Sequence, residues 1–171
     1  TAATGIVGLG GLGGEEFYSS AFRVSADGSV VVGSSRSPTS GSRVEAHRWT
    51  AATGMVGMGY LPGGESSSVA SGVSDDGSVV AGVSTSALSP SFGEAFRWTE
   101  ATGLVGLGGL PVDLDPVSVP WGLSADGAIV VGWAFSENGR EAFRWNESEG
   151  MIGMGDLPAG RSPRLFLIIE I

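Results

Sequence analysis

One seventeen-residue pattern occurs three times in this chain, and this repetition constrains the fold more than any other feature. The copies are EAHRWTAATGMVGMGYL at 45–61, EAFRWTEATGLVGLGGL at 94–110 and EAFRWNESEGMIGMGDL at 141–157. A shortened copy, TAATGIVGLGGL, occupies residues 1–12. The tryptophans Trp49, Trp98 and Trp145 are 49 and then 47 residues apart. A period near 49 predicts tandem units of one supersecondary structure.

Each unit has the pattern of four short strands. The first strand ends in Val-Ser or Leu-Ser and leads into an Asp-Gly turn, in which the aspartate caps the turn and the glycine adopts a positive φ. The second strand is a β-branched run such as Val30–Gly33, typical of a strand buried on both faces. The third strand is E-A-(F/H)-R-W, and the fourth, for example Leu104–Leu107, is rich in glycine. The expected first strands are Ser19–Ser25, Val69–Ser74 and Val117–Ser124.

Short turns without helix signals predict antiparallel meanders, and four-stranded meanders repeated at 40–50 residues are typical of β-propellers. We therefore predict an all-β fold of tandem four-stranded antiparallel β-meanders, propeller-like, in one repeat domain over residues 1–171. The expected parts are a partial unit at 1–12, full units at 13–61, 62–110 and 111–157, and a partial unit or terminal strand at 158–171. Propellers usually have four to eight blades, so three units do not close easily alone.

The series E-A-F-R-W, G-L-V-G-L-G-G-L-P and V-S-x-D-G-S-V-V-x-G resembles the HAF family of bacterial extracellular repeats, from Thr1 to about Pro158. The His-Ala-Phe element that names the family is Glu-Ala-Phe or Glu-Ala-His here, so the resemblance is to the whole repeat. It implies a secreted or surface protein of bacterial origin, and it brings no catalytic residues with it. The start at Thr1, without methionine and inside a repeat, is expected of a processed product or a piece of a longer chain.

The composition disfavours several classes of partner. The net charge is −9, which disfavours nucleic acid and anionic membrane surfaces. The chain has no cysteine, so disulfides and thiolate metal sites are excluded. No apolar run approaches the roughly 18 residues of a membrane-spanning helix, and residues 1–171 contain no segment with the pattern expected of a signal peptide.

Several motifs that suggest chemistry are better explained by the repeat. Gly8, Gly10 and Gly13 satisfy G-x-G-x-x-G, but no helix signal follows, so a dinucleotide site is not expected. His47 is the only histidine and stands where the other units have phenylalanine, which predicts a packed ring. The turn aspartates lack the alternating carboxylates of a calcium loop. We predict no catalytic, cofactor-binding or metal-ligating residues and no enzymatic activity.

The arginines Arg48, Arg97 and Arg144 occupy equivalent places on the third strand. We expect each to pair within its own unit, with the turn aspartate Asp27, Asp76 or Asp126, or to stack on an aromatic ring. The sequon at Asn146 replaces a turn threonine and is interpreted as incidental.

Trp121 and Trp133 depart from the repeat, since other units have Gly72 or Phe22 and Val83 or Ser34 there. Exposed tryptophans stack on sugars, so the first alternative function is a carbohydrate-binding propeller module with a glycan contact at these two residues. The second alternative is a propeller hydrolase with paired carboxylates. The carboxylates outside the repeat pattern are Asp113, Asp115, Glu147 and Glu149.

Both ends of the chain hold incomplete units. Ile6, Val7 and Leu9 belong to a fourth strand without its three partners, and 165–171, LFLIIEI, falls in register with a first strand. Strand addition by a second copy would complete them, giving a homo-oligomer, with a filament favoured over a ring. A fragment of a longer chain, or a tail folded back in the monomer, is the alternative. The expected assembly interface is Ile6, Val7, Leu9, Leu165, Phe166, Leu167, Ile168 and Ile169. The primary hypothesis is a non-enzymatic extracellular or cell-surface structural repeat.

Overall fold

The computed structural model describes residues 5–13, 17–112 and 115–155 of the chain, and these residues form β-strands and no helix. Sheet 1 contains β1 (Ser19–Val24), β2 (Val30–Ser35), β3 (Glu45–Thr50) and β4 (Gly54–Gly57). Sheet 2 contains β5 (Ser68–Val73), β6 (Val79–Ser84), β7 (Glu94–Thr99) and β8 (Gly103–Gly106). Sheet 3 contains β9 (Ser118–Leu123), β10 (Val130–Ser136), β11 (Gly139–Asn146) and β12 (Gly150–Gly153).

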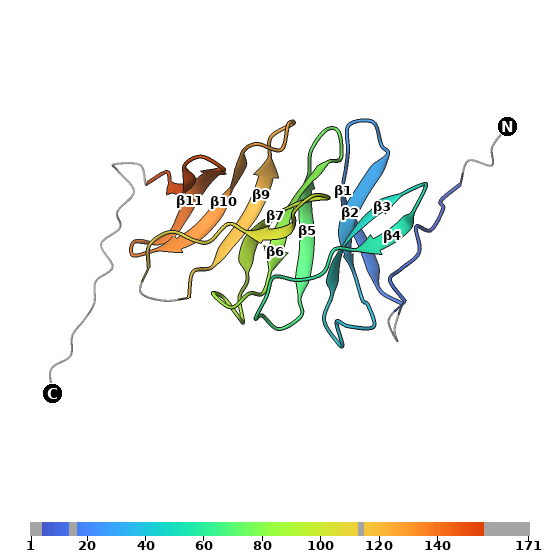
Figure 1. Ribbon diagram of the computed structural model, residues 1–171, viewed down its shortest axis with the longest axis horizontal. Coiled ribbons are helices and arrows are strands. Elements are labelled where there is room, and N and C mark those ends of the chain that lie inside the picture. The colour runs from blue at the N-terminus through green and yellow to red at the C-terminus, as the bar shows by residue number, and fades with distance from the viewer. Residues whose placement is uncertain (1–4, 14–16, 113–114, 156–171) are drawn as a thin grey trace, which may run out of the picture.

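Each sheet is an antiparallel meander, because its strands lie side by side in the order in which the chain reaches them. The three sheets stand in a row, with sheet 1 and sheet 3 at opposite ends and sheet 2 between them (Figure 1). The prediction of an all-β fold built from tandem four-stranded meanders is therefore confirmed. No helix in the described residues is long and apolar enough to cross a membrane.

The Asp-Gly turn between the first and second strands has the same hydrogen bonds in every sheet. In sheet 2 the Ser74 hydroxyl donates to Asp76 Oδ1 at 2.6 Å, and the Ser78 N–H donates to the same oxygen at 2.9 Å. The Val79 N–H in turn donates to the Ser74 hydroxyl oxygen at 2.9 Å. Gly77 has a φ of 72°, which a residue with a side chain rarely adopts. The expected capping role of the aspartate is confirmed, and the serine before it is part of the same turn.

These turns give the stability of the protein a dependence on acid pH. The serine hydroxyl bond, and after it a main-chain N–H, lower the pKa of Asp27 and of Asp76 from 3.8 to about 2. Because the folded-state pKa lies below the unfolded value, the stabilisation is fully present above pH 3.8 and is lost as the pH falls toward 2. We expect the thermal midpoint to fall across this window. The double variant D27N/D76N keeps the acceptor oxygens without titrating them, so its midpoint should fall less; an equal decline would contradict the assignment.

A β-bulge occurs at the same place in the first strand of every sheet. In sheet 1 the pairing with β2 shifts between Ala21 and Arg23, and in sheet 2 the pairing with β6 shifts between Ala70 and Gly72. In sheet 3, Pro120 and Gly122 pair with consecutive residues of β10. The bulged residues are therefore Phe22, Ser71 and Trp121. This corrects the alignment of Trp121 with Gly72, which was displaced by one residue.

The hydrophobic core consists of two clusters that lie between neighbouring sheets. Between sheets 1 and 2, Val30 and Val32 of β2 meet Val80 and Phe96 of sheet 2, and all four side chains are buried. A second cluster of the same kind lies between sheets 2 and 3 and includes Ala81, Ala95, Leu107, Val130 and Phe143. Along the second strand, alternate side chains thus point to the following and to the preceding sheet.

The expectation that the second strand is buried on both faces holds where a sheet has two neighbours. Val79, Val80 and Ala81 of the middle sheet are all buried. In sheet 3, Val130 is buried by sheet 2, whereas Val131 points the other way and is 40% exposed. In sheet 1, Val31 is only half-buried for the corresponding reason. Within the described part of the chain, the two outer sheets therefore each have one face that no other sheet covers.

Sheet 3 differs from the other two at the connection between its second and third strands. Sheets 1 and 2 have long polar loops there, at 36–44 and 85–93, whereas β10 and β11 are joined by the tight turn Glu137-Asn138. The two strands are longer in consequence and bring Phe135 opposite Arg140. The connection after the second strand thus differs in length between the units, and the length of the two strands changes with it.

Candidate functional site

Neighbouring sheets are joined at their Asp-Gly turns by a line of main-chain hydrogen bonds. The Ala26 N–H donates to the Asp75 carbonyl at 3.0 Å, and the Asp75 N–H donates to the Ala125 carbonyl at 2.9 Å. Each turn thus directs its N–H to the following turn and its carbonyl to the preceding one. Among the described residues, the Ala125 N–H has no following turn and the Ala26 carbonyl has no preceding one. The two ends of the row are complementary, a donor at sheet 3 and an acceptor at sheet 1.

The interface between two neighbouring sheets is here called a joint. The arginine of the third strand reaches across each joint to the next sheet. Arg48 Nε and Nη2 lie 3.4 and 3.3 Å from the Gly77 carbonyl oxygen, and Arg97 Nε lies 3.1 Å from that of Gly127. The expectation of pairing with an aspartate of the same unit is wrong, because the acceptor is a main-chain carbonyl of the next unit. The alternative, stacking on an aromatic ring, is confirmed for Arg48, whose guanidinium carbon lies 5.9 Å from the centre of the Trp98 ring.

Arg144 is the arginine without a following sheet in the described residues. Its Nη1 instead pairs with Glu149 Oε2 at 2.7 Å, in an exposed salt bridge that also lowers the pKa of Glu149. Glu149 stands where the other units have Thr53 and Thr102. Only one guanidinium nitrogen is used in this pair. The Nε of Arg144, the atom that crosses the joint in Arg97, is not part of it.

The turn glycine is required by how closely the sheets approach. A Cβ on Gly77 would lie 2.3 Å from the Val30 side chain, and a Cβ on Gly127 would lie 2.5 Å from Val79. At the two ends of the row, the equivalent residues are Gly28 at sheet 1 and Ile129 at sheet 3, and each lacks its partner in the described residues. Nothing lies within 4 Å of a Cβ built on Gly28, and Ile129, which corresponds to Val30 and Val79, is only half-buried. Ile129 and Gly28 are therefore two matching halves of one contact.

A buried serine at the start of the first strand forms two more hydrogen bonds across each joint, to main-chain atoms of the preceding unit. Ser68 Oγ accepts from the Ala46 N–H at 2.8 Å and donates to the Gly59 carbonyl at 2.6 Å. Ser118 makes the corresponding bonds to the Ala95 N–H and the Gly108 carbonyl, at 2.9 and 2.6 Å. Sequence analysis missed these serines. The sequence pattern that could have revealed them is a serine that recurs at the same distance before the aspartate of each Asp-Gly turn.

A glutamate completes this arrangement from the preceding sheet. Glu94 Oε1 accepts from the Gly108 N–H at 2.8 Å, and Glu45 Oε1 accepts from the Gly59 N–H at 3.0 Å. Both carboxylates are buried. Glu141 makes the equivalent bond to the Gly155 N–H at 2.8 Å but is only half-buried.

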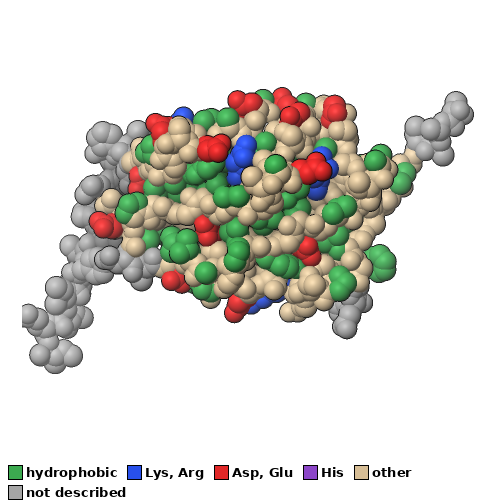
Figure 2. Space-filling model, in the orientation of Figure 1, with side chains coloured by type: hydrophobic (Ala, Val, Ile, Leu, Met, Phe, Trp, Pro, Cys, Tyr) green, Lys and Arg blue, Asp and Glu red, His purple; other side chains and the backbone are tan. Residues whose placement is uncertain are grey.

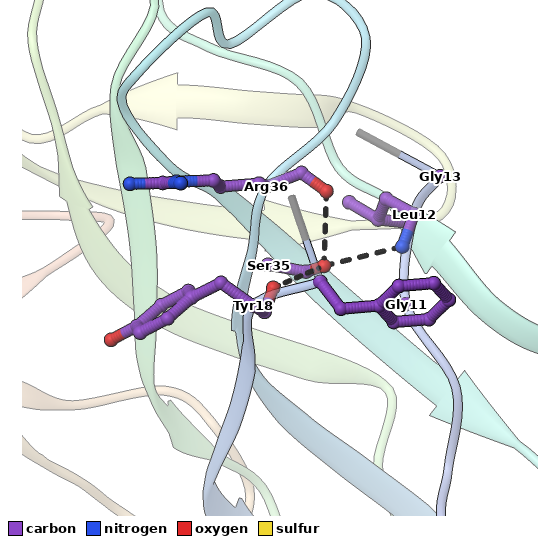
Figure 3. Close-up of a pocket in the computed structure, with 7 residues that line it drawn as sticks. Gly11, Leu12, Gly13, Tyr18, Ser35 and Arg36 are labelled. Atoms are coloured by element: carbon purple, nitrogen blue, oxygen red, sulfur yellow. Dashed lines mark hydrogen bonds between the residues drawn. The ribbon is translucent and has the colours of Figure 1, made fainter. Parts of the chain in front are cut away.

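The segment before β1 is held on sheet 1 as the ends of the other units are held on sheets 2 and 3. Ser19 Oγ donates to the Gly10 carbonyl at 2.9 Å. The Leu12 N–H donates to Ser35 Oγ at 3.2 Å, as the Leu61 N–H does to Ser84 Oγ at 3.0 Å. Figure 3 shows Ser35 between Leu12 and the carbonyls of Tyr18 and Arg36, beside a small pocket. Residues 10–12 thus occupy the site of a preceding unit's end.

The expected N-terminal interface residues lie just before this anchored segment. Ile6 and Val7 are exposed, Leu9 is half-buried, and none of the three belongs to a sheet. They correspond to Met55, Val56 and Met58 of sheet 1, where the first two form part of β4. The other expected interface residues, Leu165, Phe166, Leu167, Ile168 and Ile169, lie outside the described residues.

The structure brings the two exceptional tryptophans together. The guanidinium carbon of Arg140 lies 4.0 Å from the centre of the Trp133 ring and 5.1 Å from that of Trp121. Phe135 meets Trp133 edge to face, with ring centres 5.5 Å apart. Trp121 is 65% exposed. The four side chains form an aromatic and arginine cluster on the uncovered side of sheet 3, at the end where its strands are extended.

The remaining candidate groups are dispersed. His47 is fully buried and packed in sheet 1, in the place of Phe96 and Phe143. Glu147 lines a shallow depression with Arg97 and Trp145, Glu149 is paired with Arg144, Asp115 is exposed, and Asp113 lies outside the described residues. No group of three potential metal ligands occurs in the part of the chain that the structure describes.

Comparisons with known proteins identify no relative, since neither a family model nor a curated protein matches this sequence. The resemblance to HAF-type extracellular repeats therefore stays a prediction.

Proposed function

We propose that this chain is a non-enzymatic structural repeat protein that self-associates end to end. In this arrangement the far face of sheet 3 covers the near face of sheet 1 of the next copy. The far face comprises Ala125, Ile129, Val131 and Arg144, and the near face comprises Val24, Ala26, Gly28, Val31 and Trp49. The resemblance of the repeats supports a location outside the cell or at its surface.

One observation carries this proposal: the two internal joints use the same set of contacts, and the ends of the row hold the two halves of that set. The Ala125 N–H, the Arg144 guanidinium and the Ile129 side chain match the Ala26 carbonyl, the Gly28 carbonyl and the open space over Gly28. Apolar side chains are also uncovered at both ends. Val24 is 56% exposed at sheet 1, while its equivalents Val73 and Leu123 pack in the joints.

Head-to-tail contacts of this kind form an open filament unless the rotation between copies closes them into a ring. We favour the filament. A closed pair would contain six sheets, which is within the range of closed propellers. The acidic net charge of −9 opposes association at low ionic strength, because like-charged copies repel each other. Figure 2 shows acidic side chains scattered over the visible face and few basic ones. Assembly should therefore strengthen with added salt.

The mass of the native protein, measured by light scattering over a range of concentrations, tests the proposal. We expect masses of several chains, and we expect Ile129→Glu to weaken association at least tenfold, because it places a charge where an apolar side chain should be buried. Leu88→Glu is the matched control, since Leu88 is an exposed apolar residue on a loop of the middle sheet. A chain that stays monomeric at every concentration, or equal effects of the two variants, would overturn end-to-end association.

The aromatic and arginine cluster supports carbohydrate binding as a second candidate function. The exposed Trp121 ring offers a flat surface for a sugar, and the adjacent Arg140 has hydrogen-bond donors for its hydroxyl groups. A glycan array would test this candidate, with Trp121→Ala as the variant that should lose binding. Binding that survives in this variant would place the sugar elsewhere.

A further inference from the structure

We infer that the joint between two copies forms by strand exchange: residues 5–8 of one copy replace β12 as the fourth strand of sheet 3 in the other. This inference rests on the proposed end-to-end association and specifies how the chains meet. The segments have closely similar sequences, GIVGLG at 5–10 and GMIGMG at 150–155. Exchange of a similar element between copies is a low-cost route to association, because the incoming strand can form again the main-chain hydrogen bonds that the outgoing strand breaks.

A fourth strand and the first strand of the next sheet are linked by a short, anchored connection at each internal joint. After β4, Gly59 is held by Glu45 and by Ser68, and Leu61 is held by Ser84. At the N-terminal end the second half of this connection already exists, because Ser19 holds the Gly10 carbonyl and Ser35 holds the Leu12 N–H. The first half is missing, since no glutamate in the described residues accepts from the Gly10 N–H.

Sheet 3 of a second copy supplies the missing half. Glu141 occupies the position of Glu45 and Glu94, and its carboxylate now accepts from Gly155. The Ala142 N–H corresponds to those of Ala46 and Ala95, which donate to Ser68 and Ser118. After the exchange, Glu141 would accept from the Gly10 N–H, and the Ala142 N–H would donate to Ser19 Oγ. The connection between sheet 3 of one copy and sheet 1 of the other would then have the same hydrogen bonds as the connections within one chain.

The exchange also avoids a conflict that simple stacking would create. If β12 kept its place, the Gly155 carbonyl would fall where the Gly10 carbonyl already accepts from Ser19 of the next copy. Residues 10–12 are joined directly to sheet 1 and keep their bonds when Ile6 and Val7 move. In the described structure these two side chains are exposed and unpaired, so moving them disrupts no packing. The displaced strand β12 has only four residues and pairs with β11 alone.

The register of β11 and β12 predicts which residues meet. Ile152 lies opposite Arg144, so after exchange Val7 should lie opposite Arg144 of the other copy. Opposite residues of an antiparallel pair have Cα atoms about 4.5–5.5 Å apart, within the range of a disulfide. The chain has no cysteine, so introduced cysteines form the only possible disulfides.

The test mixes a V7C chain with an R144C chain and oxidises the mixture. Exchange predicts a disulfide between one chain of each kind, visible as a two-chain band without reductant, whereas oxidation of V7C mixed with R48C should give at least tenfold less. Arg48 is the matched control, because it occupies the same place on sheet 1, whose fourth strand leads directly into an internal joint.

A deletion of residues 1–9 separates the two proposals. It keeps the Gly10 and Leu12 anchors and removes the exchanged strand, so we expect association to weaken at least tenfold by light scattering. If the intact chain assembles, the deletion assembles equally well and the V7C and R144C chains do not cross-link, the exchange is wrong and end-to-end association stands. If the intact chain never assembles, both fall.

Discussion

Replacing Phe96 with alanine is expected to lower the free energy of unfolding by about 3–5 kcal/mol. The ring is fully buried at the joint of sheets 1 and 2, together with Val30, Val32 and Val80. It lies over Gly82, where a Cβ would stand 2.6 Å from the ring and 2.1 Å from the Val69 carbonyl oxygen. Because the glycine and the ring fill one space, the truncation leaves a cavity that the rigid strands cannot close. Denaturant unfolding monitored by tryptophan fluorescence measures the loss.

Phe135 supplies the matched control for this variant. It lies on the far face of sheet 3, is 42% exposed and contacts Trp133 edge to face, so Phe135→Ala should lower the free energy of unfolding by only about 1 kcal/mol. Equal losses for Phe96→Ala and Phe135→Ala would show that the joint does not hold the sheets together.

Replacing His47 with phenylalanine is expected to stabilise the protein at neutral pH by about 1 kcal/mol, because removing a buried unsatisfied nitrogen outweighs the loss of one hydrogen bond to Ser20. His47 is fully buried and its Nε2 lies 3.1 Å from the Ser20 carbonyl oxygen, so Nε2 carries the proton and donates it. The other nitrogen, Nδ1, is buried and has no hydrogen-bond partner among the residues that the structure describes. A phenylalanine removes this unsatisfied atom, and two other units already carry that ring over a glycine.

The gain should grow as the pH falls below 6.5. Burial lowers the pKa of His47 below its ordinary value of 6.5, so the unfolded chain takes up a proton that the folded chain resists. The stability is therefore unaffected by this group above pH 6.5 and is lost as the pH decreases toward the folded-state pKa. His47→Phe should remove that part of the decline below pH 6.5, measured by denaturant unfolding at several pH values.

The reciprocal variant Phe96→His provides the control for this assignment. It should introduce the same kind of acid sensitivity into sheet 2. If His47→Phe lowers the stability, or leaves its pH dependence unchanged, the buried and unpartnered Nδ1 is not the cause.

The fold could be predicted from the sequence because the repeat carries local signals that agree with each other. The Asp-Gly turn, the β-branched second strand and the glycines around the fourth strand occur in the same order in each unit. Turn chemistry and hydrophobic alternation act between near neighbours in the chain, so they are readable from residues such as Asp76 and Val79 without knowing the tertiary structure.

The joints could not be predicted in the same way, because their contacts link residues about 30 positions apart through main-chain atoms. The partner of Arg97 is the main-chain carbonyl of Gly127. Every residue has such a carbonyl, so the type of residue at position 127 does not indicate the contact. Pairing with an aspartate was the natural expectation from charge, and it was wrong. The bulge at Ser71 could not be predicted either, because a bulged position does not require a particular type of residue. The meeting of Trp121 and Trp133 at Arg140 depends on the shortened turn after β10.

The equivalence of the two joints has a consequence for how such a chain can change in length. Sheet 2 presents one face to sheet 1 and the opposite face to sheet 3, and these faces are the two halves of the same contact. A gene that gained or lost one internal period by recombination between its repeats would therefore encode a chain in which every remaining joint is still matched. Its stability would change by one unit and one joint, as in other linear arrays. The number of units in such a chain can therefore change during evolution while the two end sheets stay the same.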